Sequence, residues 1–476
     1  MRDTRIPAVS RFGITGRAAA AYLLLAGLQR GVSLLILPFI SHAMLPSEYG
    51  AASTLTASAM LIVAIIAAPV EQLVFRAAAR GGDDAPALIR VAGTYCYLVL
   101  PLFIACVAAG SVVYLPDLFG ISGQIWAIEL LAVGFLPAAT YFALPFVRAR
   151  QDLRKFVWLA ATSILVTALS KFLLIVVWGL GVFGWAISDL VSAVVSALLA
   201  IALIRLPRVH VAARNICAVL TFSIPLIPHR ASFWALSSLS RPAMATVSTL
   251  AQVGLLSFGL NLAAVANMIL AELNQAFQPR YSREKFPAPN GETRKPVHWQ
   301  LVLAFAIPAL VGASVALGGQ FIFAESYWPS FALTGLLLCG QVAYGLYLVP
   351  MNYIVQSAGL PKFSALASVS GATIILVGIL ALGRQYGAVG VAYVTSSGFA
   401  AMAVVAFILT RILRLNISWS SWLKNWPEIA LGLAGLVCSI AALVLIVGST
   451  ASYIFAVASI VLTVYALALT AARRSS

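Results

Sequence analysis

Apolar residues run through the chain in long blocks, and polar residues gather in the short connections between them. Blocks of about 20 apolar residues have the length that an α-helix needs to cross a bilayer. The sequence predicts fourteen such helices, at 18–40, 50–73, 88–114, 125–147, 156–178, 183–204, 217–239, 251–277, 299–323, 329–357, 363–382, 388–410, 428–447 and 452–471. We therefore expect an all-α polytopic membrane protein.

The composition agrees with this pattern and narrows the class of protein. Of the 476 residues, 62% are hydrophobic and 9% are charged, whereas a soluble domain is about 25% charged. The first apolar block is longer than the 7–15 residues or so of a signal peptide core, which favours a retained span. Histidines are few and dispersed and no CxxC pair occurs, so we expect no metal and no bound cofactor.

The positive charge follows the connections in a regular way. The formal net charge is +16, and twenty-four of the thirty lysines and arginines lie at the N-terminus, in the even-numbered connections or at the C-terminus, while a twenty-fifth, Arg90, lies at the cytoplasmic start of the span 88–114. Cytoplasmic loops carry such an excess. We expect both termini to be cytoplasmic, and the basic residues to report membrane topology rather than binding to nucleic acid.

Short stretches recur at a nearly constant distance along the chain. LRKFVWLA and LPKFSALA, GVFGWA and GAVGVA, PSEYGAAS and LAQVGLLS, and the looser pair EQLVFR and LNQAFQPR are all separated by about the same interval, which is 204 residues between Gly50 and Gly254. Six spans per unit place both copies in the membrane with the same sense. We expect two parallel six-helix repeats and an added pair, as an N-lobe at 1–210, a C-lobe at 211–415 and spans 13 and 14 at 416–476.

Arginines stand inside two predicted spans. Arg30 lies within YLLLAGLQRGVSLLILPFI at 22–40, and Arg230 lies 200 residues later in span 7, which continues to Arg241. An arginine at the bilayer centre costs about 2.5–3.5 kcal/mol on insertion scales, so such residues usually have a function. Guanidinium groups from both halves favour a phosphate ligand. A structural ion pair is the alternative, and Arg241 has the further alternative of extending to the membrane surface.

Other polar residues in the spans complete the candidate site. Lys171 is a further candidate for the anionic headgroup, with an ion pair to Asp189 as its alternative. Ser and Thr stripes on spans 5 and 6 indicate a polar interior. Residues suited to contact sugars are Gln29, Trp234, Asn261, Gln341, Tyr344 and Asn352. The residues that could bind a coupled H⁺ or Na⁺ are Glu71, Asp189 and Glu272. For the two glutamates, the alternative is an ion pair with a basic loop. Pro225 and Pro228 should bend span 7.

Three stretches give the chain a resemblance to a known family. The stretches that carry the resemblance are GLQRGVSLLILPFISHAMLPSEYGAAS at 27–53, FSIPLIPHRASFWALSSLSRP at 222–242 and NQAFQPRYSRE at 274–284. The short glycine turns GVFGWA and GAVGVA add to it. On these residues, the chain resembles the bacterial polysaccharide flippases (Wzx type) of the multidrug/oligosaccharidyl-lipid/polysaccharide (MOP) exporter superfamily. The resemblance implies a two-lobe fold with a cationic cavity and alternating access. It further implies export of an undecaprenyl-pyrophosphate-linked oligosaccharide across the bacterial cytoplasmic membrane, alongside the polysaccharide polymerase and the chain-length machinery.

Other functions remain open on the same sequence. A lipid II flippase would need the same cavity chemistry. A multidrug (MATE-type) drug or cation antiporter would need an acidic cavity, and acids are few in the spans. A membrane polysaccharide polymerase or glycosyltransferase would need large outward loops, whereas the outward connections here are short. We therefore expect a transporter and not an enzyme.

Overall fold

A computed structural model describes residues 31, 34–114, 117–283, 293–415, 417 and 426–472. Twelve helices within these residues are long and apolar enough to cross a membrane. The longest, Lys362–Ile412, has a non-helical residue at Gly387 that divides it into the two predicted spans 363–382 and 388–410. Most of the predicted span 18–40, with Arg30 and Gln29, lies outside the described residues, and its end continues into a short helix, Leu34–Ala43. The predicted all-α membrane fold is confirmed.

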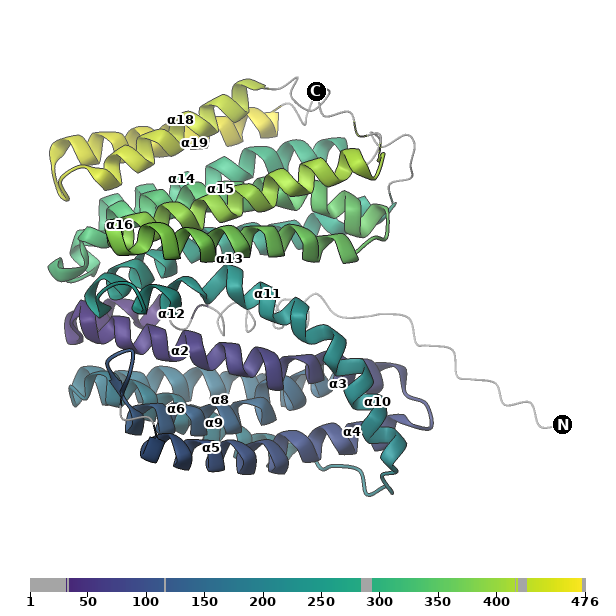
Figure 1. Ribbon diagram of the computed structural model, residues 1–476. Coiled ribbons are helices and arrows are strands. Elements are labelled where there is room, and N and C mark those ends of the chain that lie inside the picture. Colours follow the sequence, from purple (N-terminus) through teal and green to yellow (C-terminus); the bar gives the residue numbers. More distant parts are fainter. Residues whose placement is uncertain are drawn as a thin grey trace.

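The first half of the chain forms the lower layers in Figure 1, drawn in purple and blue. Its helices are α2 (Pro46–Ile66), α3 (Ala68–Arg80), α4 (Ala85–Thr94), α5 (Leu100–Tyr114), α6 (Gly123–Pro137), α7 (Leu144–Ala149), α8 (Leu153–Lys171) and α9 (Gly181–Leu203). π-helical turns at Tyr95–Val99, Ala138–Ala143 and Phe172–Val177 extend α4, α6 and α8. Between α5 and α6 lie two antiparallel strands of two residues each, β1 (Asp117–Leu118) and β2 (Ile121–Ser122).

Most of the second half forms the upper layers, drawn in teal, green and yellow, while its first helix, α10 (Ala213–Ser223), lies beside α4. The second half also contains α11 (Ile227–Ser238), α12 (Ser240–Ala245), α13 (Leu250–Arg283), α14 (Arg294–Ile322), α15 (Pro329–Asn352), α16 (Lys362–Ile412), α18 (Trp426–Val444) and α19 (Thr450–Ala472). A 3₁₀ turn at Glu325–Tyr327 precedes α15 and a π-helical turn at Tyr353–Ser357 follows it. The added pair α18–α19 packs on α14.

Span 7 crosses from one half to the other. A 3₁₀ turn at Ile224–Leu226 separates α10 from α11, as the nearby prolines predict, because proline removes a backbone donor from a helix. α10 packs on α3 and α4, whereas α11 packs on α2 and α16. The two pieces therefore run obliquely over the boundary between the layers (Figure 1), and side chains on α11 reach both halves.

The two short Gly turns are built in the same way in both repeats. Gly181 starts α9 with φ +52°, and Gly387 has φ +55°, a conformation that glycine adopts without steric cost. A Cβ on Gly181 would lie 2.8 Å from Glu48 Oε1, and the Ala388 N–H donates to Gln252 Oε1 at 3.0 Å. Glu48 and Gln252 are 204 residues apart, so repeat-related side chains support repeat-related turns.

Candidate functional site

The two repeats meet where α2 and α13 cross near their N-terminal ends. Gly50 and Gly254 face each other there. A Cβ on Gly50 would overlap the carbonyl oxygen of Leu250, and a Cβ on Gly254 would overlap the carbonyl oxygen of Pro46. Glycine is needed at both positions because each backbone occupies the space of the other side chain. The two overlaps are equivalent under the repeat, since Gly254 follows Gly50 by 204 residues and Leu250 follows Pro46 by the same 204.

One turn further along, a residue contacts its own counterpart. Ser53 Oγ donates to Ser257 Oγ at 2.8 Å, and both serines are buried. A contact between equivalent residues is the mark of a two-fold axis, where the same surface meets itself. We call the contact of Gly50, Ser53, Gly254 and Ser257 the axial contact. It closes the two halves against each other at the Pro46 end of α2.

A polar cluster lies next to the axial contact. Arg241 Nη2 on α12 donates to Asn261 Oδ1 on α13 at 3.1 Å, and Asn261 Nδ2 donates to the hydroxyl of Tyr49 on α2. Tyr49 is buried. These two hydrogen bonds connect α12, α13 and α2. Arg241 was predicted to contact the headgroup and Asn261 to contact sugar, and those roles stay predictions.

Two tryptophans attach neighbouring helices to α2. Trp234 Nε1 on α11 donates to the carbonyl oxygen of Ala57 at 2.8 Å. Trp185 Nε1 on α9 donates to Thr56 Oγ1 at 3.0 Å. Helix α2 therefore contacts α9 on its own side of the boundary and α11 and α13 from the second half of the chain. Trp234, predicted to contact sugar, uses its indole N–H for this backbone contact.

At the other end of α11, Arg230 joins α11 to α3. Arg230 Nη2 lies 3.2 Å from Glu71 Oε2, and Arg148 Nη2 lies 3.4 Å from Glu71 Oε1. Arg230 and Glu71 side chains are each 27% exposed. The Arg230 Nε–H is buried and has no hydrogen-bond acceptor among the described residues. Glu71 thus pairs with a basic residue in the last turn of α7 and also with the candidate anion ligand, whereas the sequence predicted pairing with a basic loop as one of its two roles.

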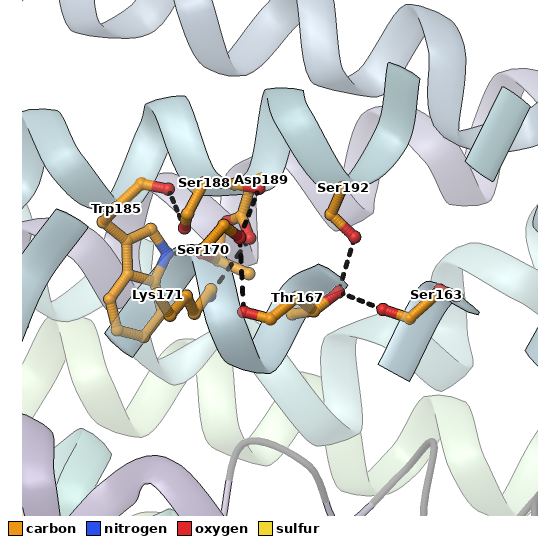
Figure 2. A network of polar contacts seen from close by, with 9 residues as sticks. Ser163, Thr167, Ser170, Lys171, Trp185, Ser188, Asp189 and Ser192 are labelled. Carbon is orange, nitrogen blue, oxygen red and sulfur yellow. Dashed lines mark hydrogen bonds and ion pairs between the residues drawn. The ribbon is translucent and has the colours of Figure 1, made fainter. Parts of the chain in front are cut away.

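Lys171 lies deep in the first half, at the end of α8. Its Nζ is 3.0 Å from Asp189 Oδ1 on α9 and 3.5 Å from the centre of the Trp185 ring. Figure 2 shows the ammonium between the carboxylate and the indole. Lys171 is 5% exposed. The expected alternative of an ion pair between Lys171 and Asp189 is what the structure shows.

The hydroxyl stripes of α8 and α9 pack on each other beside this pair. Thr167 Oγ1 lies 2.5 Å from Ser192 Oγ and donates to the Ser163 carbonyl at 2.7 Å, and Ser170 Oγ donates to the Ser188 carbonyl at 3.4 Å. All of these groups lie along one seam in Figure 2. The stripes therefore find partners within the first half.

Glu129 joins the cluster of Lys171 and Asp189, and it is absent from the candidates drawn from the sequence. It lies on α6, is 4% exposed, and interacts electrostatically with both Asp189 and Lys171. Its Oε2 has no hydrogen-bond partner among the described residues. The available signal was an acidic residue inside the apolar span 125–147, which is a functional candidate by default.

Two predicted sugar contacts lie in the seams of the second half. Asn267 Nδ2 donates to Gln341 Oε1 at 3.0 Å. Asn352 Nδ2 donates to Asn274 Oδ1 at 2.7 Å, and Gln300 Nε2 donates to the same oxygen at 2.6 Å. These amides on α13, α14 and α15 are buried or partly buried and satisfy one another, as buried polar groups must.

Two further candidates also have neighbours of their own. The Tyr344 ring lies 6.2 Å from the ring centres of Tyr347 and Phe399. Glu272 Oε2 accepts a hydrogen bond from Gln275 Nε2 at 3.2 Å. No described contact joins either residue to Arg230 or Arg241, so the structure does not bring them together with the arginines.

Two cavities are formed by described residues. One, of about 390 Å³, opens between α3, α4 and α10, and Arg76, Arg80, Asp83 and Asp84 line its polar side. A second, of about 10 Å³, lies between α13, α14 and α15. Neither is lined by the predicted headgroup ligands.

Removing the ammonium from the buried cluster should destabilise the protein strongly. We expect Lys171→Met to cost about 3–5 kcal/mol, because the Asp189 carboxylate would then lack its buried counter-charge. Unfolding of purified protein in detergent measures this. Lys171→Met combined with Asp189→Asn should recover most of the loss. If the double variant is no more stable than the single one, the ion pair does not account for the effect.

Comparisons with known proteins bear on the fold. No protein-family model and no curated protein sequence matches the chain. A solved structure of the lipid II flippase MurJ, in an inward closed conformation, is similar with a TM-score of 0.72 and 12% identity, covering 97% of this chain and 100% of that one. A multidrug resistance MATE family transporter of the MOP superfamily, in an inward-facing conformation, is similar with a TM-score of 0.64 and 14% identity, covering 83% and 96%.

A third solved structure is the MATE multidrug transporter DinF-BH in a ligand complex, with a TM-score of 0.57 and 16% identity, covering 87% of this chain and 99% of that one. The part of this chain left out by the flippase alignment is smaller than the α18–α19 pair, so at least part of that pair lies within the shared architecture. The chain therefore has the fold of the MOP exporter superfamily.

Proposed function

We propose that the protein is a flippase that moves an undecaprenyl-pyrophosphate-linked oligosaccharide from the inner to the outer leaflet of the bacterial cytoplasmic membrane by alternating access. The fold is shared with a lipid II flippase over 97% of the chain. Parallel repeats related by an axis along the membrane normal place substrate sites between the halves in transporters. The proposal uses that architecture and the charges at the boundary between the halves.

The axial contact supplies one of the two states that alternating access requires. The predicted topology puts the Pro46 end of α2 on the outer side, so Gly50, Ser53, Gly254 and Ser257 close the outer side. These residues are small, and the single Ser53–Ser257 hydrogen bond joins them. Separation of the halves there breaks the Ser53–Ser257 and Tyr49–Asn261 hydrogen bonds and unpacks α2 from α13, so the proposed rocking must open this contact.

The observation that carries the proposal is the state of Arg230. Its ion pair with Glu71 bridges α11 and α3, Glu71 is shared with Arg148, and the buried Nε–H has no described acceptor. A phosphate accepts from the Nε–H and an Nη–H together, which a guanidinium presents as a planar fork. In this proposal the pyrophosphate replaces Glu71 as the partner of Arg230, and Arg30, Lys171 and Arg241 are the further candidate cations.

The balance of charge around Glu71 also helps to distinguish between the kinds of substrate carried by transporters with this fold. Among the described residues, Glu71 is the only carboxylate with which Arg148 or Arg230 forms an ion pair. A boundary with two guanidinium groups for one carboxylate suits an anionic headgroup better than a cationic drug. A lipid II headgroup has the same phosphate chemistry, so it remains the second candidate on the strength of the structural similarity.

Deletion of the gene tests the proposal against its rivals. We expect an undecaprenyl-linked oligosaccharide to build up on the cytoplasmic side of the membrane, with loss of surface polysaccharide, measured by extraction and mass spectrometry of lipid-linked sugars. Build-up of lipid II would favour the second candidate. Loss of surface polysaccharide without any build-up would favour a polymerase, and altered drug resistance alone would favour an antiporter.

A further inference from the structure

The larger cavity, between α3, α4 and α10, has a polar wall and an apolar wall. Arg76 and Arg80 lie one turn apart on α3, and Asp83 and Asp84 follow in the connection to α4. The apolar wall is formed by Leu73, Ala77, Ala85, Leu88, Ala218 and Phe222. The volume of about 390 Å³ lies within the range of small-ligand sites, roughly 300–1,000 Å³. The cavity can therefore hold a molecule with a charged end and an apolar end.

The charges on the polar wall are only partly neutralised by the protein. Asp84 forms an ion pair with Arg214 at 3.1 Å. Among the described residues, no carboxylate pairs with Arg76 or Arg80, and no cation pairs with Asp83. A simple anion beside the two arginines would leave the Asp83 carboxylate without a counter-charge. A ligand that carries one negative and one positive group can pair with both signs of charge, which is the more favourable arrangement.

The cavity lies behind a helix that faces lipid. The predicted topology places the connection between α3 and α4 on the cytoplasmic side of the membrane. Ile216 and Leu220 on α10 and Ile224 in the next turn are spaced by four residues and are 48%, 51% and 57% exposed, as expected of a helix face in contact with lipid. Ala218 and Phe222, which line the cavity, lie on the opposite side of α10. The cavity is therefore at the edge of the bundle, within reach of phospholipid headgroups (Figure 1).

We propose that this cavity binds a membrane phospholipid whose headgroup carries both a phosphate and a primary ammonium group. The guanidinium groups of Arg76 and Arg80 bind the phosphate, for which they are suited as planar donors. The ammonium pairs with Asp83, and the first carbons of the acyl chains pack on the apolar wall. Basic pockets between helices on the cytoplasmic side of a membrane bind lipid headgroups, and here the Asp83 carboxylate selects a headgroup with a cationic end.

A lipid in this cavity also connects the two halves of the chain. Helices α3 and α4 belong to the first half, whereas α10 begins the second half and packs on both of them. The Arg214–Asp84 ion pair joins α10 to the start of α4, and its side chains are 78% and 64% exposed. An ion pair this exposed holds helices together only weakly. The bound lipid adds contacts between α10 and the first half, so its binding should raise the unfolding temperature.

Native mass spectrometry of the full-length protein in detergent tests the site, with three added phospholipids as probes. We expect phosphatidylethanolamine to be retained several-fold more than phosphatidylglycerol, which lacks the ammonium, or phosphatidylcholine, whose ammonium is fully methylated. Arg76→Gln with Arg80→Gln should lower the retention of phosphatidylethanolamine several-fold and abolish its effect on the unfolding temperature. Arg154→Gln with Arg208→Gln removes the same charge from exposed positions outside the cavity and should change neither. Equal loss of binding in both double variants would overturn the site.

Asp83→Asn tests the identity of the headgroup. This variant removes the partner of the ammonium and leaves the two arginines, so we expect the preference to reverse in favour of phosphatidylglycerol. Glycerophosphoethanolamine, which has the same headgroup without acyl chains, should not displace the lipid, because it leaves the apolar wall unoccupied. An unchanged preference in Asp83→Asn, or displacement by the soluble headgroup, would overturn the proposal. These measurements involve no transport, so their outcome is independent of the proposed function.

Discussion

Replacing Arg230 with alanine should lower translocation of the lipid-linked substrate by about 10- to 100-fold while the protein remains folded. The estimate follows from losing hydrogen bonds to a charged group, each worth about 1.5–3 kcal/mol, with about 1.4 kcal/mol for each factor of ten. The measurement is transport of a purified undecaprenyl-pyrophosphate-linked oligosaccharide in proteoliposomes, with protein amount and unfolding temperature recorded for each variant.

Two variants separate a ligand role from a structural role of Arg230. Arg148→Ala removes the other partner of Glu71, whose side chain pairs with both arginines, and it should lower transport far less than Arg230→Ala, because only Arg230 is proposed to bind the phosphate. The charge exchange Glu71→Arg with Arg230→Glu can restore an ion pair but moves the cation to α3. Full transport by the exchanged protein would show that only the ion pair matters, and would refute phosphate binding at Arg230.

Replacing Gly50 with valine should abolish transport by preventing closure at the axial contact. Its Cβ would overlap the Leu250 carbonyl oxygen and lie 2.8 Å from the Gly254 nitrogen, and backbone atoms cannot move aside as a flexible side chain can. Overpacking costs about 1–3 kcal/mol even where side chains adjust. Ser53→Cys with Ser257→Cys, in a background without the native cysteines, should form a disulfide when the axial contact is closed. We expect Gly50→Val to remove most of that disulfide yield.

The matched control for Gly50 is Gly110→Val. Gly110 lies on α5, and a Cβ there would meet no heavy atom within 4 Å. This variant changes a helical glycine in the same way without a steric cost, so transport should match that of the unaltered protein, and the disulfide yield of the Ser53→Cys, Ser257→Cys protein should be the same with and without it. Normal transport by Gly50→Val would mean that the halves do not need to close at this point during the cycle.

Much of the architecture follows from the sequence alone. Apolar blocks of membrane-spanning length predict the helices, because lipid offers the backbone no hydrogen-bond partner other than itself. The bend in span 7 follows from the missing donors of Pro225 and Pro228, and a 3₁₀ turn is found there. The recurrence of Gly50 at Gly254 predicts the duplication. All of these signals are local, or they repeat along one chain, so they need no knowledge of the packing.

The partner of each polar residue was decided only by the tertiary structure. The sequence marks Arg230, Asp189 and Lys171 as costly in a membrane, but either a ligand or a neighbouring side chain can offset that cost. The packing brings Glu71 to Arg230 from 159 residues away, and it brings Glu129 to the Lys171–Asp189 pair. The axial contact likewise arises only where the two repeats cross. Electrostatic and steric compensation depend on distance in space, and a span pattern carries no distance between helices.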